Sequence, residues 1–182
     1  MGLKIDFIRG TVTVVEPPPV EVEATKVLAA AGDYAAEDVL SESATDGLGT
    51  PFVFRHVARK DGGSFRITKT IALLKTTDLV PRIKLFLFTS RPTSELDDNS
   101  ANTAVLTADR SRYVGRVELP AMSDLGGNSE AIATLDTGSN LPLEGKCATG
   151  SDDLYGIAVT EDAITGEAAG MALMLKLFVR QD

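Results

Sequence analysis

The chain has 182 residues, of which 43% are hydrophobic and 5% are aromatic, and it contains no tryptophan. This length is typical of one medium-sized domain and is long enough to bury a substantial core. The net charge of -8 at pH 7 would repel a nucleic-acid backbone, so we expect no direct binding to nucleic acid. The longest apolar run, residues 171–179, is about half as long as a membrane helix and contains Lys176, so we expect no transmembrane span.

The first 25 residues have the pattern of an extended arm. Residues 3–15 alternate apolar and polar side chains, residues 17–19 are prolines that fix an extended connection, and residues 20–24 alternate again. Such a segment needs another surface on which to lie, and it can add a strand to a partner's sheet. The residues that we expect to contact a partner are Leu3, Ile5, Phe7, Val12, Val14, Pro17, Pro18, Pro19, Val20 and Val22.

The first residues carry no targeting signal that we recognise. They lack the apolar core of a secretory signal peptide, and Asp6 stands where a myristoylation signal has serine or threonine. We therefore expect synthesis in a cytoplasm. Cys147 is the only cysteine, which excludes an intrachain disulfide, and we interpret it as a small buried apolar residue.

From residue 50 onward, period-two patterns predict β-strands. Residues 52–58 and 64–74 are joined by a glycine-containing loop, which predicts a β-hairpin. Residues 83–88 are apolar on both faces apart from Lys84, which is typical of a central strand covered on both sides. Further strands are expected at residues 113–119, 154–159 and 173–179, and the residues that we expect on the core face of 64–74 are Phe65, Ile67, Ile71 and Leu73.

The fold class that these patterns predict is all-β. Turn-rich links separate the strands, and no amphipathic helix of three turns is found, so we expect an antiparallel β-sandwich that is jelly-roll-like and has an extended N-terminal arm. We divide the chain into an arm over residues 1–25 and a single domain over residues 26–182. Residues 94–110 and 120–153 are long connections, and such loops tend to be functional or covered by a partner.

No motif in the sequence predicts catalysis or cofactor binding. The glycines lie between expected strands, without the GxGxxG or GxxxxGK[ST] arrangement that cradles phosphate. The single histidine, His56, lies in a run that we interpret as a strand rather than a loop at a cleft, which disfavours a catalytic triad. Because there are 26 acidic residues, pairs of carboxylates arise by chance. We therefore expect a protein without enzymatic activity and without a cofactor.

Residues 94–103, SELDDNSANT, concentrate acidic and amide groups after an expected core strand. An EF-hand loop needs oxygen ligands at fixed positions and a glycine at its sixth position. Counted from Asp97, the sequence has Ala101 at a ligand position and Asn102 at the glycine position. We therefore interpret the segment as a turn in which Asp and Asn side chains bond nearby backbone N–H groups. An irregular calcium site built from Asp97, Asp98 and Asn102 is the weaker alternative.

Three segments carry a resemblance to a known class of protein. Residues 32–40 contain a Y-x-x-x-D-V pattern, residues 62–67 form a glycine-rich step into a strand, and residues 83–102 contain an L-x-L-F…P…D-N-x-A pattern. Taken in this order, they resemble small structural proteins of tailed-bacteriophage heads, over residues 32–119.

The resemblance implies a capsid cement or decoration protein that binds the outside of the shell. The implied partners are the major capsid protein and further copies of the chain itself, as a dimer or trimer. The implied location is the virion surface, after synthesis in the cytoplasm of the bacterial host. The alternative is a receptor-binding or carbohydrate-binding β-sandwich module of a phage particle, although few aromatic residues are available to stack on sugar rings.

Overall fold

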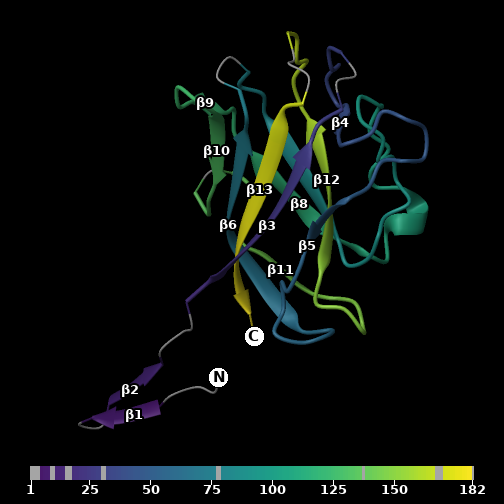
Figure 1. Cartoon of the computed structure of the whole chain (residues 1–182). Helices are drawn as coiled ribbons and strands as arrows, with labels where there is room; N and C mark the ends of the chain where they lie inside the picture. The colour runs from purple at the N-terminus through teal and green to yellow at the C-terminus, as the bar shows by residue number, and fades with distance from the viewer. Residues whose placement is uncertain are drawn as a thin grey trace.

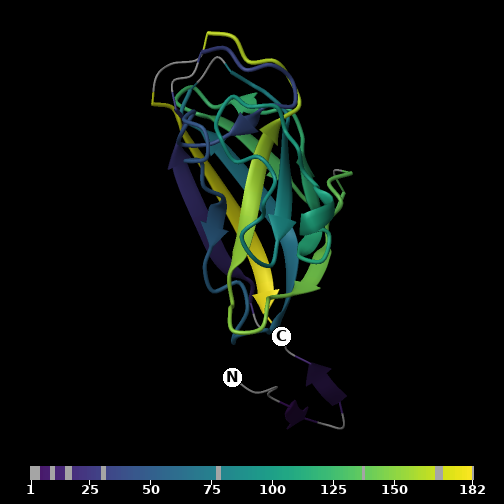
Figure 2. The same cartoon turned by 90° about the vertical axis from the view of Figure 1, so that its right-hand side faces the viewer.

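Two antiparallel β-sheets pack face to face in the computed structural model, as Figures 1 and 2 show. The structure describes residues 5–8, 11–14, 18–29, 32–76, 79–136, 138–166 and 170–181. Its only helix within these ranges is the short 3-10 turn η1 (Thr107–Asp109). The expected all-β sandwich is therefore confirmed.

The first sheet contains the longest strands of the chain. Its order is β3-β13-β6-β10-β9, and β11 also pairs with β6. The strands β10 and β11 pair with successive halves of β6, so they act as one strand that the chain leaves and rejoins. The bounds are β3 (Val20–Val27), β6 (Ser64–Leu74), β9 (Ser123–Asp124), β10 (Ser129–Ala133), β11 (Leu143–Lys146) and β13 (Ala172–Gln181).

The second sheet has the order β4-β12-β7-β8, and β5 also pairs with β12. The short strands β4 and β5 pair with successive parts of β12, so they too act as one interrupted strand. The expected central position of residues 83–88 is confirmed, because β7 lies between β12 and β8. The bounds are β4 (Val39–Leu40), β5 (Phe52–Phe54), β7 (Ile83–Phe88), β8 (Tyr113–Leu119) and β12 (Leu154–Thr160).

The strand order follows a simple rule once the two interrupted strands are each counted as one and the two-residue edge strand β9 is left out. The sandwich strands then run in the chain order β3, β4/β5, β6, β7, β8, β10/β11, β12 and β13. The first strand pairs with the last, the second with the seventh, the third with the sixth and the fourth with the fifth. Successive pairs alternate between the two sheets, so the sandwich is one long antiparallel ribbon wrapped on itself.

The N-terminal region differs in part from the expected arm. The strands β1 (Ile5–Ile8) and β2 (Thr11–Val14) pair with each other as a hairpin, with Ile5 opposite Val14 and Phe7 opposite Val12. The strand β3 is an edge strand of the first sheet, paired along its whole length with β13, so the sandwich begins near residue 20 rather than 26.

This change revises the expected partner-contacting residues. Val22 is only 7% exposed and faces the core, so its side chain serves the sandwich and not a partner. Val20 is 41% exposed, and Pro18 and Pro19 are also exposed. Leu3 and Pro17 lie outside the described residues.

The expected hairpin between residues 52–58 and 64–74 is wrong. The strand β5 ends at Phe54 and pairs with β12, whereas β6 belongs to the other sheet. The linking residues bond to a different segment, because Val57 N–H donates to Asp152 O at 2.8 Å and Gly62 N–H donates to Ser151 O at 2.9 Å. The glycine-containing link is therefore a crossover between sheets, which local sequence cannot distinguish from a hairpin turn.

A β-bulge in β6 also changes which side chains enter the core. Phe178 of β13 pairs with Lys69 and the next residue, Val179, pairs with Ile67, which leaves Thr68 unpaired. The alternation therefore changes phase at Thr68. Phe65 and Ile67 are buried as expected, but further along the strand the buried residues are Thr70, Ala72 and Leu74, while Ile71 and Leu73 lie on the outer face.

The space between the sheets holds one large apolar core. The expected inward row of β13 is confirmed, because Leu173, Leu175, Leu177 and Val179 are all fully buried. Cys147 is 6% exposed within the same core, as its interpretation as a small apolar residue requires.

Because of the bulge, truncation of two neighbouring leucines should lower the free energy of unfolding by different amounts. Leu74→Ala should lower the free energy of unfolding by about 2 to 5 kcal/mol, because the side chain is buried between the sheets. Leu73→Ala should cost less than about 1 kcal/mol, because this side chain lies on the outer face. Urea denaturation of both variants at low protein concentration measures the difference, and equal losses would contradict the bulge.

Candidate functional site

The long connection from β7 to β8 covers the outer face of the second sheet. Five outward apolar side chains of this sheet are at most 7% exposed and form a second, smaller core, against which Tyr113 and Tyr155 pack. The Phe88 and Tyr113 rings contribute to it, with centroids 5.5 Å apart. The connection contributes three half-buried residues, Leu96, Ala104 and Val105, and the buried residues beneath are Val39, Phe86, Phe88, Ile157 and Val159.

Two buried carboxylates in this connection bind backbone groups of the distant loop 41–51. Asp97 is 5% exposed, and its two oxygens accept hydrogen bonds from Gly47 N–H and Gly49 N–H, each at 2.7 Å. Asp98 is 2% exposed and accepts from Ser41 N–H at 2.7 Å and from the Tyr34 hydroxyl at 2.9 Å. These carboxylates therefore hold two loops together, and the expectation that they bond to nearby backbone is wrong.

The candidate calcium ligands are not brought together as a site. Asp97 and Asp98 are bound by N–H and O–H donors, which a cation would have to displace. Asn102 acts locally, because its side-chain oxygen accepts from Ala104 N–H at 2.8 Å. Within the described ranges, the one group of His, Cys, Asp or Glu with atoms close enough for a metal is the exposed cluster of His56, Asp152 and Asp153.

A third buried carboxylate, Asp109, was not identified from the sequence. It is fully buried in η1 and accepts hydrogen bonds from the N–H and hydroxyl groups of Thr93 and Ser94, at 2.6 to 2.9 Å. Burial alone would raise its pKa, but the hydrogen bonds from Ser94 and Thr93 outweigh that effect and lower the pKa. Nothing in the local sequence marks this role, because Ser94 and Thr93 lie 15 and 16 residues earlier in the chain.

A polar latch closes the edge of the sandwich between β3 and loop 41–51. The Lys26 ammonium contacts the carboxylate of Glu42 and the carbonyl of Thr50, and it lies 5.0 Å from the centre of the Phe52 ring. Burial lowers the pKa of Lys26. Burial acts to raise the pKa of Glu42, but hydrogen bonds from Lys26, Thr50 and Ser41 lower it to about 2. The Glu42 carboxylate therefore stays ionised at neutral pH.

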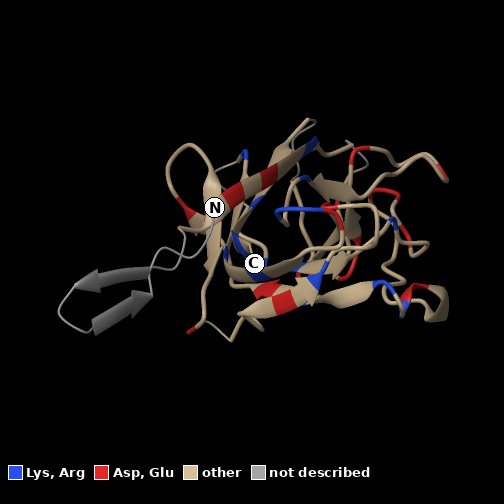
Figure 3. Ribbon diagram, turned by 90° about the horizontal axis from the view of Figure 1, so that it is seen from below, with Lys and Arg blue, Asp and Glu red and all other residues tan. Residues whose placement is uncertain are grey.

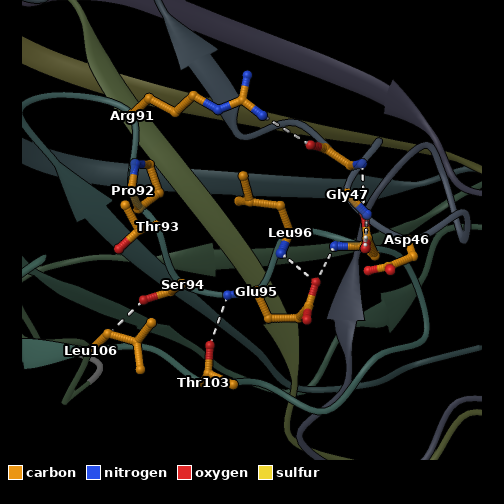
Figure 4. A pocket seen from close by; sticks show the side chains of 12 residues that line it. Asp46, Gly47, Arg91, Pro92, Thr93, Ser94, Glu95, Leu96, Thr103 and Leu106 are labelled. Carbon is orange, nitrogen blue, oxygen red and sulfur yellow. Dashed lines mark hydrogen bonds between the residues drawn. The ribbon is translucent and has the colours of Figure 1, made fainter. Parts of the chain in front are cut away.

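An open hollow lies where the two loops meet (Figure 4). Its volume is about 490 Å³, and it is lined by Asp46, Gly47, Gly49, residues 91–97, Thr103 and Leu106. Arg91 donates to Gly49 O at 3.3 Å, and the Glu95 carboxylate accepts from the N–H groups of Leu96 and Asp97 at 2.9 Å. No aromatic residue lines the hollow, so it offers no stacking platform for a sugar ring.

His56 is not on a strand, in contrast to its interpretation from the sequence. It follows the end of β5 with a φ of 58°, is exposed, and its Nδ1 lies 2.9 Å from Asp152 Oδ2. This hydrogen bond raises the pKa of His56. The single thiol is not an activated nucleophile, because burial raises the pKa of Cys147 to about 11 and keeps it protonated at neutral pH.

Comparison with known proteins gives no family for this chain. No protein-family model matches it, and no curated protein matches it with significance. In the part of the chain that the structure describes, no helix is long and apolar enough to cross a membrane.

Gly49 should be essential for the contact between the loops. A Cβ atom at this position would overlap the carbonyl group of Leu96 and lie 2.7 Å from Asp97 N. Gly49→Ala should therefore lower the free energy of unfolding by about 1 to 3 kcal/mol and speed hydrogen exchange at residues 96–98. Gly127→Ala is the matched control, because its Cβ would meet no atom within 4 Å. Equal stability of the two variants would contradict this account.

Asp98 should make the protein less stable as the pH rises. Burial is the main cause that raises its pKa to about 6, from a usual 3.8, so the folded state binds this proton more tightly than the unfolded chain. The resulting stability is fully present below the unfolded pKa and is lost as the pH rises through about 6.

The measurement compares wild type with Asp98→Asn, which keeps an oxygen acceptor without the charge. Between about pH 4 and pH 7, wild type should lose up to about 3 kcal/mol of unfolding free energy relative to the variant. Denaturant titrations at several pH values give both curves. Parallel curves would show that Asp98 does not titrate in this range.

Proposed function

We propose that this chain is a non-enzymatic structural protein of a bacteriophage virion, which binds the outer surface of the capsid and stabilises the shell. The proposal rests on one observation, which is that the three buried carboxylates all serve to hold loops in place. Asp97, Asp98 and Asp109 all accept hydrogen bonds from loop backbone or hydroxyl groups. The carboxylates of these loops therefore hold the loop backbone in place. The fixed surface that results suits a cement protein better than a reaction site.

The strand order supports a jelly roll as the form of the sandwich. Eight strands pair first with last, second with seventh, third with sixth and fourth with fifth, and the pairs alternate between two sheets. A wrapped antiparallel ribbon of this kind is the arrangement of double-sheet jelly rolls, which occur in viral capsid domains and in lectins. The fold is thus compatible with a virion role, although fold alone does not specify function.

Two of the three segments that resemble phage head proteins also meet in space. The Tyr34 hydroxyl donates to Asp98 at 2.9 Å, and Asp38 forms an isolated β-bridge with Ala101. Val39 N–H donates to Ser100 O at 2.9 Å and joins the same two segments. The Y-x-x-x-D-V and D-N-x-A patterns therefore form one structural unit beside β4, which gives a physical reason for their presence together.

The partners that we propose are the major capsid protein and other copies of this chain. The hairpin β1–β2 precedes the first strand of the sandwich, and β3 is an edge strand whose outer backbone groups could pair with a further strand. The alternative of a carbohydrate-binding module has less support, because no aromatic residue lines the hollow between the loops.

Capsids that lack this protein provide the direct test. Purified protein should bind them to saturation and raise the temperature at which the shells rupture, because each bound copy holds neighbouring capsid subunits together. Occupancy is measured by electron microscopy and rupture by DNA release or light scattering. Absence of binding would contradict the proposal, and specific binding on a glycan array would favour the carbohydrate-binding alternative.

Removal of residues 1–17 should separate the role of the N-terminal segment from that of the sandwich. The truncation ends before β3, so the circular dichroism spectrum should remain that of a β-sandwich. Shell occupancy at a given protein concentration should fall, because the truncated chain lacks the strands available for pairing with a partner. A truncated protein that decorates shells as tightly as the full chain would exclude this role.

A further inference from the structure

The outer faces of the two sheets differ in whether another segment of the chain covers them. The apolar side chains outside the second sheet are buried beneath the connection between β7 and β8. No described segment crosses in front of the first sheet in Figure 1, and β3 lies at the margin of the sandwich in Figure 2. The outward apolar residues of the first sheet belong to neither buried core. The pairing of β3 with β13 places Val27, which is 56% exposed, and Ala172 among them. The other five are Ile71, Leu73, Ile132, Met174 and Phe178.

We call these five residues the apolar strip. Lys176 interrupts the strip on β13, where it lies outward between Met174 and Phe178 and opposite Ile71. Met174 pairs with Leu73, and the register places Ile71 opposite Ile132 on the neighbouring strand. Phe178 extends the strip along β13, where the Lys69 ammonium lies 4.6 Å from the centre of its ring. Ile132 is 36% exposed, and the other four are half-buried by their neighbours on the sheet.

The charges around the apolar strip are balanced, although the whole chain carries a net charge of -8. Lys176 pairs with Glu21 at 3.2 Å and with Glu23 at 3.4 Å, and Arg66 pairs with Glu144 at 3.1 Å. Figure 3 shows both signs on the strands of the sandwich. The charged residues in outward positions on this face are Glu21, Glu23, Glu130 and Glu144 against Arg66, Lys69, Lys146, Lys176 and Arg180, which leaves a single excess positive charge.

We propose that the apolar strip is the interface through which two copies of this chain form a face-to-face dimer. Two acidic copies repel each other over most of their surface, and this face is a place where that repulsion is locally cancelled. Because the face carries both signs and little net charge, it attracts neither a strongly acidic nor a strongly basic partner. A second copy supplies the same apolar centre and the same mixed rim, as a two-fold interface requires.

The proposal does not depend on the capsid role, because it concerns the protein alone in solution. It commits to a two-fold dimer, since a patch that packs on itself closes with two copies. The hairpin β1–β2 is not part of the interface. Truncation of residues 1–17 should therefore leave dimerisation unchanged.

Sedimentation equilibrium over a wide range of protein concentration tests the interface. Wild type should be a dimer that dissociates on dilution, and Leu73→Lys or Met174→Lys should each raise the dissociation constant about tenfold or more, because each inserts an unpaired charge at the apolar centre. Met174→Leu should keep the dimer. The circular dichroism spectra of all the variants should match wild type, because the altered side chains lie outside the core.

The matched controls are Leu48→Lys and Leu106→Lys, which add the same charge at apolar residues that are 64% and 40% exposed on the loops. They should leave the dissociation constant unchanged. A monomer at all concentrations, a trimer, or equal weakening by the controls would overturn the proposal. If wild type is a monomer and Met174→Lys abolishes binding to capsids, the strip faces the capsid protein instead, and the dimer is excluded.

Discussion

The buried carboxylate of Asp98 is the constraint on which the arrangement of the loops depends. A carboxylate removed from water is stable only when strong donors surround it, and here the donors are the Tyr34 hydroxyl and the Ser41 N–H group. Both come from a segment about 60 residues earlier in the chain. The requirement to satisfy one charge thus fixes two distant segments against each other. The neighbouring Asp97 carboxylate is satisfied in the same way, by the N–H groups of Gly47 and Gly49.

The interruption between β4 and β5 in the second sheet has a related cause. Between β4 and β5 the chain leaves the second sheet, and this excursion presents Gly47 and Gly49 to Asp97 while Glu42 reaches Lys26. A continuous strand would have kept these backbone groups in the ladder and left Asp97 without donors. The sheet therefore gives up a few ladder hydrogen bonds, and in return the connection that covers Phe86 and Phe88 is held in place.

Features that depend on alternation along one strand can be predicted from the sequence. Features that depend on contacts between residues far apart in the chain cannot. The strands β7, β8, β12 and β13 follow from unbroken apolar patterns, and the all-β sandwich follows from them. The bulge at Thr68 was missed because its cause lies in the register with Phe178, 110 residues away. The crossover after Phe54 resembles a hairpin turn until its bonds to Asp152 are known. Asp97 and Asp98 were recognised as turn residues, but their donors could not be found by local inspection.

The bulge also links the core to the outer surface. Before Thr68 the odd-numbered residues of β6 are buried, and after it the even-numbered ones are buried, so the short Ala72 enters the core while Ile71 and Leu73 turn outward. Without the phase change these two large side chains would fill the core, and β6 would add no large apolar side chain to the outer face beside Met174 and Ile132. A strand that places its larger apolar residues outside loses burial unless another surface covers them. The long connection covers the opposite sheet. In the dimer that we propose, a second copy of the chain covers this face.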